Sequence, residues 1–209
     1  MPESVRTHLG MAEAAEPGSI PPDAKLQRCQ VVWTRELFDA AVAMSRQLGL
    51  TPLPLTSVMT GESREVGRVL VSIAHEVMRT GRPVVAPCAL IATGETAVRL
   101  RGDVKGEGGA NQELAAGACL DLAPDAPVAV LALDTDGADG PTDIAGGLTD
   151  GTTYERVRRA GFDLCRALNE HDVSPALRAA GDTLITGPTG TNVNDIVIIV
   201  VDRPPIGSR

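Results

Sequence analysis

Residues Asp134–Asp143 combine the residue types and the spacing that could do chemistry. This segment holds four aspartates and two glycines, and it directly follows the apolar run Val128–Leu133. Four carboxylates so close together repel one another unless a cation or hydrogen-bond donors offset their charge. The glycines let a ligand approach the backbone closely. The segment is therefore a candidate site for a divalent cation or for accepting a hydroxyl proton. The alternative is a solvated acidic turn whose aspartates cap the next helix.

Two further glycine-rich loops carry complementary polar groups. Lys105–Asn111 and Gly187–Asp195 supply backbone N–H groups, hydroxyls and amides. Backbone N–H groups and a helix N-terminus can hold phosphate or carboxylate. If all three loops meet at one edge of a sheet, they form a site for a small, oxygen-rich, anionic substrate together with a divalent cation.

The elements that must position these loops are short apolar strands and amphipathic helices. Val128–Leu133 and Ile196–Val201 are apolar on both faces, which predicts strands covered on both sides in an α/β sheet. Helical spacing and end signals predict helices over residues 34–48, 66–80, 112–122, 153–160, 163–169 and 174–180. We expect Asn111 to cap one of them, and Thr152–Glu155 to form a capping box for another.

The first half of the chain is predicted to add more sheet. Residues 31–57 read as one β-α-β unit with strands at 30–33 and 53–55, and such a unit needs further sheet beside it. Residues 84–92 and 96–101 are predicted to form a hairpin around the turn Thr93–Glu95. The expected organisation is a flexible arm (1–30), a partial β-α-β unit (31–84), an α/β domain (85–203) and a tail (204–209).

Composition narrows the classes of function. The net charge of −8 argues against a nucleic-acid partner, which requires a basic surface. No apolar run approaches the ~18 residues that span a membrane, and the start of the chain lacks the pattern of a signal peptide. The four widely spaced cysteines predict reduced, mostly buried thiols in a cytoplasmic protein. An exposed sheet edge near residues 31–57 predicts a homodimer or a complex.

Several sharper motifs are excluded or weakened. The chain has no P-loop, and Gly106–Asn111 fails the dinucleotide fingerprint because its last position is Asn. Leu131–Ala138 resembles the opening motif of haloacid-dehalogenase-type phosphatases, with Asp134 as nucleophile and Asp136 as acid/base. That family needs a downstream lysine, and no lysine follows Lys105.

Four motifs in order carry a more extensive resemblance. Gly108–Glu113, Asp134–Asp143, Asp150–Thr152 and Thr186–Asp195 resemble the MOFRL domain, the C-terminal domain of the glycerate 2-kinase family, some of whose members are named hydroxypyruvate reductase. The resemblance covers about residues 85–202, and residues 31–84 resemble the end of the family's first domain. It implies an α/β fold with a mixed sheet covered by helices on both faces, preceded by the partial β-α-β unit.

The resemblance also implies an activity: phosphorylation of D-glycerate at its 2-hydroxyl by ATP, with Mg²⁺ offsetting the charge of the transferred group. It implies catalytic roles for Asp136, Asp139, Asp143, Asn111 and Glu113, with Asp136 and Asp139 also as metal ligands. It implies substrate or phosphate binding by Lys105, Gly108, Gly109, Thr189, Gly190, Asn192 and Asn194.

Two departures from the family's pattern shape the functional hypotheses. Family members are much longer chains, and the family has Arg where this chain has Ala110. A guanidinium there could clamp a carboxylate or phosphate through two hydrogen bonds, which alanine cannot do. The hypotheses are therefore a kinase half, truncated or working with a separately encoded N-terminal half, a non-catalytic module that binds a small acid or nucleotide, and a reductase.

Overall fold

The computed structural model describes residues 3–4, 6–7, 34–100 and 105–202. The chain divides into two units, Met1–Val31 and Val32–Arg209, and the fold described below is that of the second. The predicted strand at 30–33 and the predicted arm (1–30) and tail (204–209) lie wholly or almost wholly outside the described residues. The helices are α2 (Thr34–Gln47), α3 (Ser63–Thr80), α4 (Ala110–Leu120), α5 (Thr153–Arg159), α6 (Leu164–Glu170) and α7 (Val173–Ala180). The strands are β1 (Thr51–Met59), β2 (Cys88–Gly94), β3 (Val128–Asp134), β4 (Gly146–Asp150), β5 (Thr183–Leu184) and β6 (Asp195–Val201).

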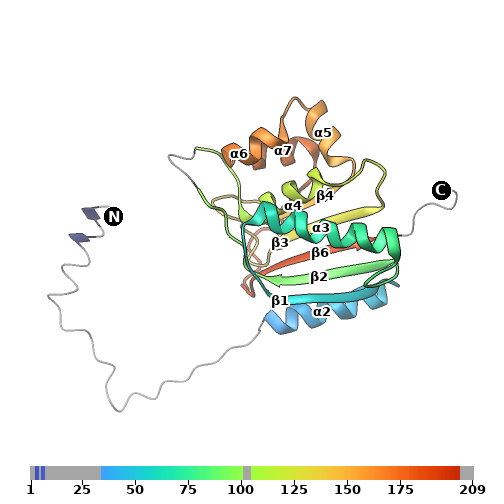
Figure 1. Cartoon of the computed structure of the whole chain (residues 1–209). Helices are drawn as coiled ribbons and strands as arrows, with labels where there is room; N and C mark the ends of the chain where they lie inside the picture. Colours follow the sequence, from blue (N-terminus) through green and yellow to red (C-terminus); the bar gives the residue numbers. More distant parts are fainter. Residues whose placement is uncertain (1–2, 5, 8–33, 101–104, 203–209) are drawn as a thin grey trace, which may run out of the picture. The chain divides into compact units, whose positions relative to one another are not determined.

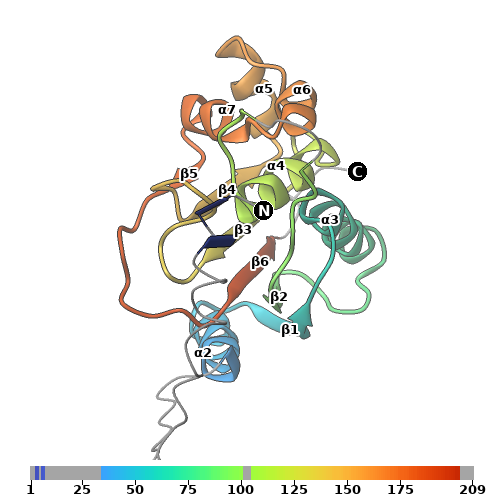
Figure 2. The same ribbon diagram turned by 90° about the vertical axis from the view of Figure 1, so that its left-hand side faces the viewer.

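One mixed sheet organises the unit, in the order β1-β2-β6-β3-β4-β5. β1 and β2 are parallel, and the other pairs are antiparallel. Helices α3 and α4 pack against each other over one face, and α2 lies on the opposite face against β1 and β2 (Figures 1 and 2). The predicted α/β class, with a mixed sheet and helices on both faces, is confirmed.

Helix α4 is buried on all sides, which explains its composition of alanine, glycine and few large residues. One side of α4 joins α3 and the sheet in the main core, and the other side joins α5, α6 and α7 in a second apolar cluster. Gly117 of α4 is needed because a Cβ there would lie 2.5 Å from the carbonyl oxygen of Arg64 in α3. Gly67 of α3 is needed in the same way, because a Cβ there would overlap the carbonyl oxygen of Leu114. The two glycines therefore allow the close approach of α3 and α4.

Several local predictions are wrong, and each error has a physical cause. The predicted hairpin does not form, because β2 pairs with β1 and β6 while residues 96–100 make only an isolated bridge from Ala97 to Glu62. Helix α4 begins one residue before Asn111, so Asn111 is not its cap. The capping box at Thr152 is also absent, since that hydroxyl donates to Asp150 instead.

Strand β4 is an element that the sequence pattern missed. No strand is predicted at Gly146 and Gly147, yet both lie in the sheet, at positions where neighbouring atoms leave no room for a side chain. A Cβ on Gly147 would lie 2.7 Å from the Cβ of Ala115 in α4. The glycines thus let α4 press closely onto the sheet. The two buried thiols, Cys88 and Cys119, fit the expectation of mostly buried cysteines, whereas Cys165 is exposed. Within the described ranges, no helix has the length and apolar character needed to cross a bilayer.

Candidate functional site

The three polar loops meet at one end of the sheet. Asp134 ends β3 and Asp195 begins β6, and these two residues are register partners across the antiparallel pair. The loop after β3 is fastened to the loop before β6: the Thr189 amide donates to the Asp136 carbonyl at 3.1 Å, and the Val193 amide donates to the Thr135 hydroxyl at 2.9 Å. The predicted convergence of the loops at one rim is therefore confirmed for the acidic loop (Asp134–Asp143) and the 187–194 loop.

The third loop joins the same rim through Asp139, which caps α4 from outside the helix. Asp139 is 2% exposed, and its carboxylate accepts from the backbone N–H of Asn111 at 3.0 Å and of Gln112 at 2.8 Å. These N–H groups have no partner within the helix, and the positive end of the helix dipole favours a negative charge there. Burial nevertheless outweighs these donors and raises the pKa of Asp139. Gly109 provides the space, because a side chain there would overlap the Asp139 carboxyl group.

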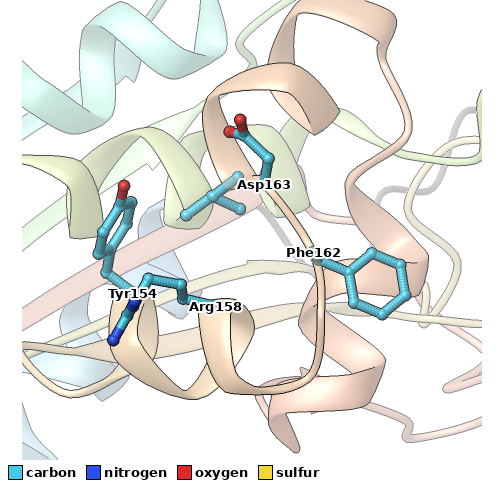
Figure 3. A pocket seen from close by; sticks show the side chains of 5 residues that line it. Tyr154, Arg158, Phe162 and Asp163 are labelled. Carbon is cyan, nitrogen blue, oxygen red and sulfur yellow. The ribbon is translucent and has the colours of Figure 1, made fainter.

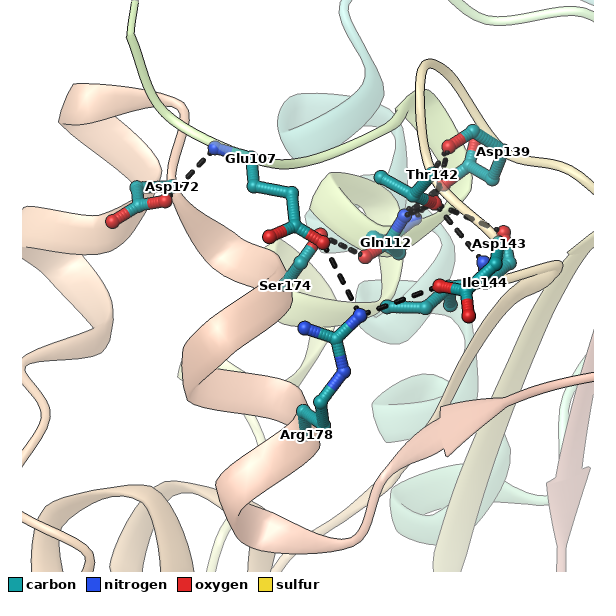
Figure 4. A network of polar contacts seen from close by, with 9 residues as sticks. All are labelled: Glu107, Gln112, Asp139, Thr142, Asp143, Ile144, Asp172, Ser174 and Arg178. Carbon is teal, nitrogen blue, oxygen red and sulfur yellow. Dashed lines mark hydrogen bonds and ion pairs between the residues drawn. The ribbon is translucent and has the colours of Figure 1, made fainter.

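Asp136 is the half-buried carboxylate between the two anchored parts of the loop. Its Oδ1 accepts from the Ala138 amide at 2.8 Å, and its Oδ2 lies 3.4 Å from the Asn192 side-chain amide. Thr189, Gly190, Asn192 and Asn194 are exposed around it on the 187–194 loop. Asp143 lies at the far end of the acidic loop, where it contacts Arg178 of α7 at 3.4 Å (Figure 4). The structure thus brings Asp136 together with Asn192 and places Asp143 against the helical layer.

Two residues predicted to belong to the site, Glu113 and Lys105, lie at the helical layer and not at the loop that holds Asp136. The Glu113 side chain is 1% exposed; its Oε2 accepts from Arg64 of α3 at 2.8 Å, and its Oε1 lies 2.7 Å from Nδ1 of His171. Lys105 is exposed on the segment leading to Gly106, which packs against the carbonyl of His171 between α6 and α7. Glu113 therefore ties α4 to its neighbouring helices, and Lys105 lies beside the α6–α7 turn. Gly108 also packs there, with its Cα side facing Val173.

Asp195 is a rim residue that the sequence reasoning left out of the site. It is 5% exposed, and burial raises its pKa to about 7, with the charges of Asp134, Asp139 and Glu95 adding to the shift and hydrogen bonding by Asn111 opposing it. Burial also raises the pKa of Asp134. The buried Oδ1 of Asn111 has no hydrogen-bond partner within the described residues. The signal that could have found Asp195 is its place opposite Asp134, at the start of the last apolar strand.

Gln112 is the second residue that sequence reasoning missed. It is fully buried, and it contacts the acidic loop and α7 through its side-chain amide. Nothing in local helix periodicity separates it from a surface glutamine. Only its position between the paired glycines and the acidic Glu113 sets it apart in the sequence.

The arrangement does not fit a metal ion held by this chain alone. Among residues 34–100 and 105–202, no three His, Cys, Asp or Glu side chains are grouped so that they could hold a metal. Of the two predicted ligands, Asp139 has both carboxylate oxygens engaged by the start of α4, which leaves Asp136 as the accessible carboxylate.

A small hollow elsewhere on the molecule lies between α5 and α6. Tyr154, Arg158, Phe162, Asp163 and Leu164 line it (Figure 3). None of these residues belongs to the three loops. The candidate site is therefore the rim around Asp136 and not this hollow.

Comparison with known proteins defines the class. The model of the MOFRL family matches residues 88–195, which is just over half of the chain, so the chain belongs to the MOFRL family. It is 40% identical over 204 residues to a glycerate 2-kinase from Pyrococcus horikoshii, covering 96% of this chain and 46% of the relative. It is 42% identical over 164 residues to a putative hydroxypyruvate reductase from Agrobacterium vitis, covering 78% of this chain and 43% of the relative.

The fold is shared with a solved member of the same group. The crystal structure of a glycerate kinase from Thermotoga maritima superposes with a TM-score of 0.78 at 39% identity, covering 85% of this chain and 43% of that one. The chain thus spans less than half the length of these relatives. Its resemblance to the C-terminal half of the glycerate 2-kinase family is confirmed.

Proposed function

We propose that this chain supplies one half of a D-glycerate 2-kinase, which transfers a phosphoryl group from ATP to the 2-hydroxyl of D-glycerate. The observation that carries the proposal is the half-buried Asp136 carboxylate, held where the acidic loop meets the 187–194 loop. The names of the Pyrococcus and Thermotoga relatives support the same reaction. A carboxylate beside amide and hydroxyl donors suits a small hydroxy acid, because it can accept the hydroxyl proton while the donors hold the acid.

The residues divide into two groups in this proposal. Asp136 accepts the proton of the substrate hydroxyl, and the exposed Thr189, Gly190, Asn192 and Asn194 bind the carboxylate or the phosphates. Asp139 and Glu113 hold the rim in shape, since their carboxylates already contact neighbouring protein groups. Asn111 contributes through its side-chain N–H, which contacts Asp139, while its Oδ1 has no partner among the described residues. Lys105, Gly108 and Asp143 lie toward the helical layer, where they would meet only an extended part of the nucleotide.

In this proposal, ATP and its Mg²⁺ ion bind together as the phosphoryl-donating substrate. ATP is the phosphoryl donor, and Mg²⁺ is expected to arrive bound to its phosphates, as is usual for an ion that keeps several water ligands. This fits the described residues, among which no three His, Cys, Asp or Glu side chains are grouped to hold a metal ion.

The other half of the active site is proposed to come from a partner. The relatives extend well beyond the region that this chain matches. β1 is an edge strand of the sheet, and such an edge is a surface on which a further chain could pair. The proposed partner is an N-terminal half of the kind that the relatives carry, and a homodimer is the alternative assembly.

Calorimetry on the purified chain tests the binding part of the proposal. Titration with D-glycerate, with 2-phosphoglycerate and with Mg-ATP should give heat for at least one ligand, and Asp136→Asn should weaken it. Asp125→Asn is the matched control, because Asp125 is exposed in the turn before β3, at the opposite end of that strand. Absence of heat with all three ligands would contradict binding at the rim.

The reductase named for the Agrobacterium relative is a weaker alternative for this chain. The described residues before α4, 98–100 and 105–109, form no strand, which gives no support for the strand–turn–helix unit of a dinucleotide site there. A constant NADH absorbance with hydroxypyruvate is the expected result. Steady oxidation of NADH would favour the reductase.

A further inference from the structure

Gln112 joins the acidic loop to α7 through its side-chain amide, whose oxygen and nitrogen both have hydrogen-bond partners. Its Oε1 accepts from the Ser174 hydroxyl at 2.6 Å, and its Nε2 lies 3.1 Å from Oδ2 of Asp139 and 3.2 Å from the hydroxyl oxygen of Thr142 (Figure 4). Gln112 and Ser174 are both fully buried. An unmade hydrogen bond at such a site would be costly, so the amide has one favoured orientation.

The chemistry of the partners fixes that orientation. The Asp139 carboxyl oxygens already accept from the backbone N–H groups of Asn111 and Gln112, so the NH₂ end of Gln112 faces them, and Oε1 faces the Ser174 hydroxyl. Glutamate at position 112 would place a second carboxylate against Asp139. An aliphatic residue would leave the Ser174 hydroxyl without its acceptor. The site therefore requires an amide and not merely a side chain of that volume.

Helix α7 also reaches the acidic loop on the outside. Arg178 contacts Glu107 at 3.2 Å and Asp143 at 3.4 Å (Figure 4). The backbone of Glu107 is itself fastened to this helical layer, since its carbonyl accepts from the Ser174 amide at 2.9 Å and its amide donates to Asp172 at 2.8 Å. The buried contact through Gln112 and the exposed contact through Arg178 thus connect one helix with two loops of the rim.

These contacts place Asp136 between two fixed points. On one side, the Thr189 amide holds the Asp136 carbonyl. On the other side, three residues along, Asp139 is held by the start of α4 and by Gln112. We propose that Gln112 is a positioning residue, which with Ser174 couples α7 to the acidic loop and keeps the Asp136 carboxylate in one orientation. Its catalytic consequence rests on the proposed function, whereas its effect on the loop does not.

Hydrogen exchange of the whole chain, monitored by NMR or mass spectrometry, tests the coupling directly. The reporter is the amide of Asp139, which donates to the Ile144 carbonyl at 2.7 Å inside the loop. We expect Gln112→Met to speed exchange of this amide roughly tenfold, the change that follows from losing one or two hydrogen bonds. Gln47→Met, the same replacement at an exposed site on α2, should leave it within about twofold. Ser174→Ala, which removes only the hydroxyl, provides a second variant should Gln112→Met not fold.

Gln112→Glu gives a pH signature that a simple packing role would not. Burial beside Asp139 would keep the new carboxyl group protonated to a higher pH than usual, and its O–H could then donate to Asp139 in place of the amide. Exchange of the Asp139 amide, corrected for the intrinsic pH dependence, should be slow at low pH and speed up as the new group ionises. The wild type gives the baseline set by Asp139, Asp134 and Asp195, whose pKa values burial also raises, and Gln112→Glu should add a step to that baseline.

The outcomes separate the two proposals. Unchanged exchange in folded Gln112→Met or Ser174→Ala would overturn the coupling, and so would a Gln112→Glu pH profile parallel to that of the wild type. A wild-type chain that binds none of the tested ligands would overturn the proposed function alone. If binding is present, loosening the loop should lower kcat in the assembled enzyme more than it raises KM, because Asp136 is proposed to act on the reacting hydroxyl.

Discussion

Replacing Arg64 by methionine should destabilise the chain by about 3 kcal/mol. Glu113 is buried at the junction of α3, α4 and α6, and Arg64 is its cationic partner, with a side chain that is 19% exposed. Removing one partner of a buried pair costs about 3–5 kcal/mol, because the other charge stays buried without compensation. The partial exposure of Arg64 and the nearby His171 place the expected cost at the lower end of that range. Methionine keeps the apolar stem, so most of the loss is electrostatic.

Urea unfolding followed by circular dichroism measures this cost, with the thermal midpoint as a second readout. For a domain of this size, a loss of about 3 kcal/mol corresponds to a lower midpoint by roughly 6–12 °C. Arg68→Met is the matched control on the same helix. The Arg68–Asp121 pair is exposed, so it should contribute less than about 1 kcal/mol.

A double variant isolates the charge. Glu113→Gln in the Arg64→Met background removes the uncompensated carboxylate, and it should recover a substantial part of the loss. The reasoning would be refuted if Arg64→Met cost no more than Arg68→Met, or if the second substitution destabilised the chain further.

The remaining predictions concern the rim and the sheet. Because burial raises the pKa of Asp195 from 3.8 to about 7, the folded chain keeps a proton that the unfolded chain has released across that window. The contribution of Asp195 to stability should therefore fall as pH rises from about 4 to 7, by up to about 4 kcal/mol in total, and Asp195→Asn should remove that contribution in urea titrations. Parallel pH profiles of the wild type and the variant would contradict this prediction. Gly146→Ala should cost about 3 kcal/mol, because its Cβ would overlap a carbonyl of β3. Gly161→Ala, with φ +87° and open space around it, should cost only about 1–2 kcal/mol, and equal costs would contradict the steric explanation.

The sequence predicted those parts of the fold whose signals are local. The apolar runs ending at Leu133 and Val201 are strands, and the helix before Gly81 ends there, because glycine adopts the left-handed conformation at that C-cap. Strand pairing could not be read in the same way. The turn-like Thr93–Glu95 segment suggested a hairpin, but β2 pairs along its whole length with β6, which lies far along the chain.

The loops of the candidate site could be predicted from the sequence, but the contacts within the site could not. Its loops were recognised from their residue types, and their convergence follows from the ends of β3 and β6. The sequence could not show which aspartate is structural and which is accessible, because the cap of α4 comes from Asp139, 28 residues after Asn111. Gln112 and Asp195 were missed for the same reason, because their partners are distant in sequence.

The most direct test of the kinase proposal is a chimera in which this chain replaces the matching region of the Thermotoga maritima glycerate kinase. Incubation with D-glycerate and Mg-ATP, followed by mass spectrometry of the products, should reveal 2-phosphoglycerate, and Asp136→Asn in the chimera should abolish it. A folded chimera that forms no 2-phosphoglycerate, assayed beside an active Thermotoga enzyme, would contradict the account.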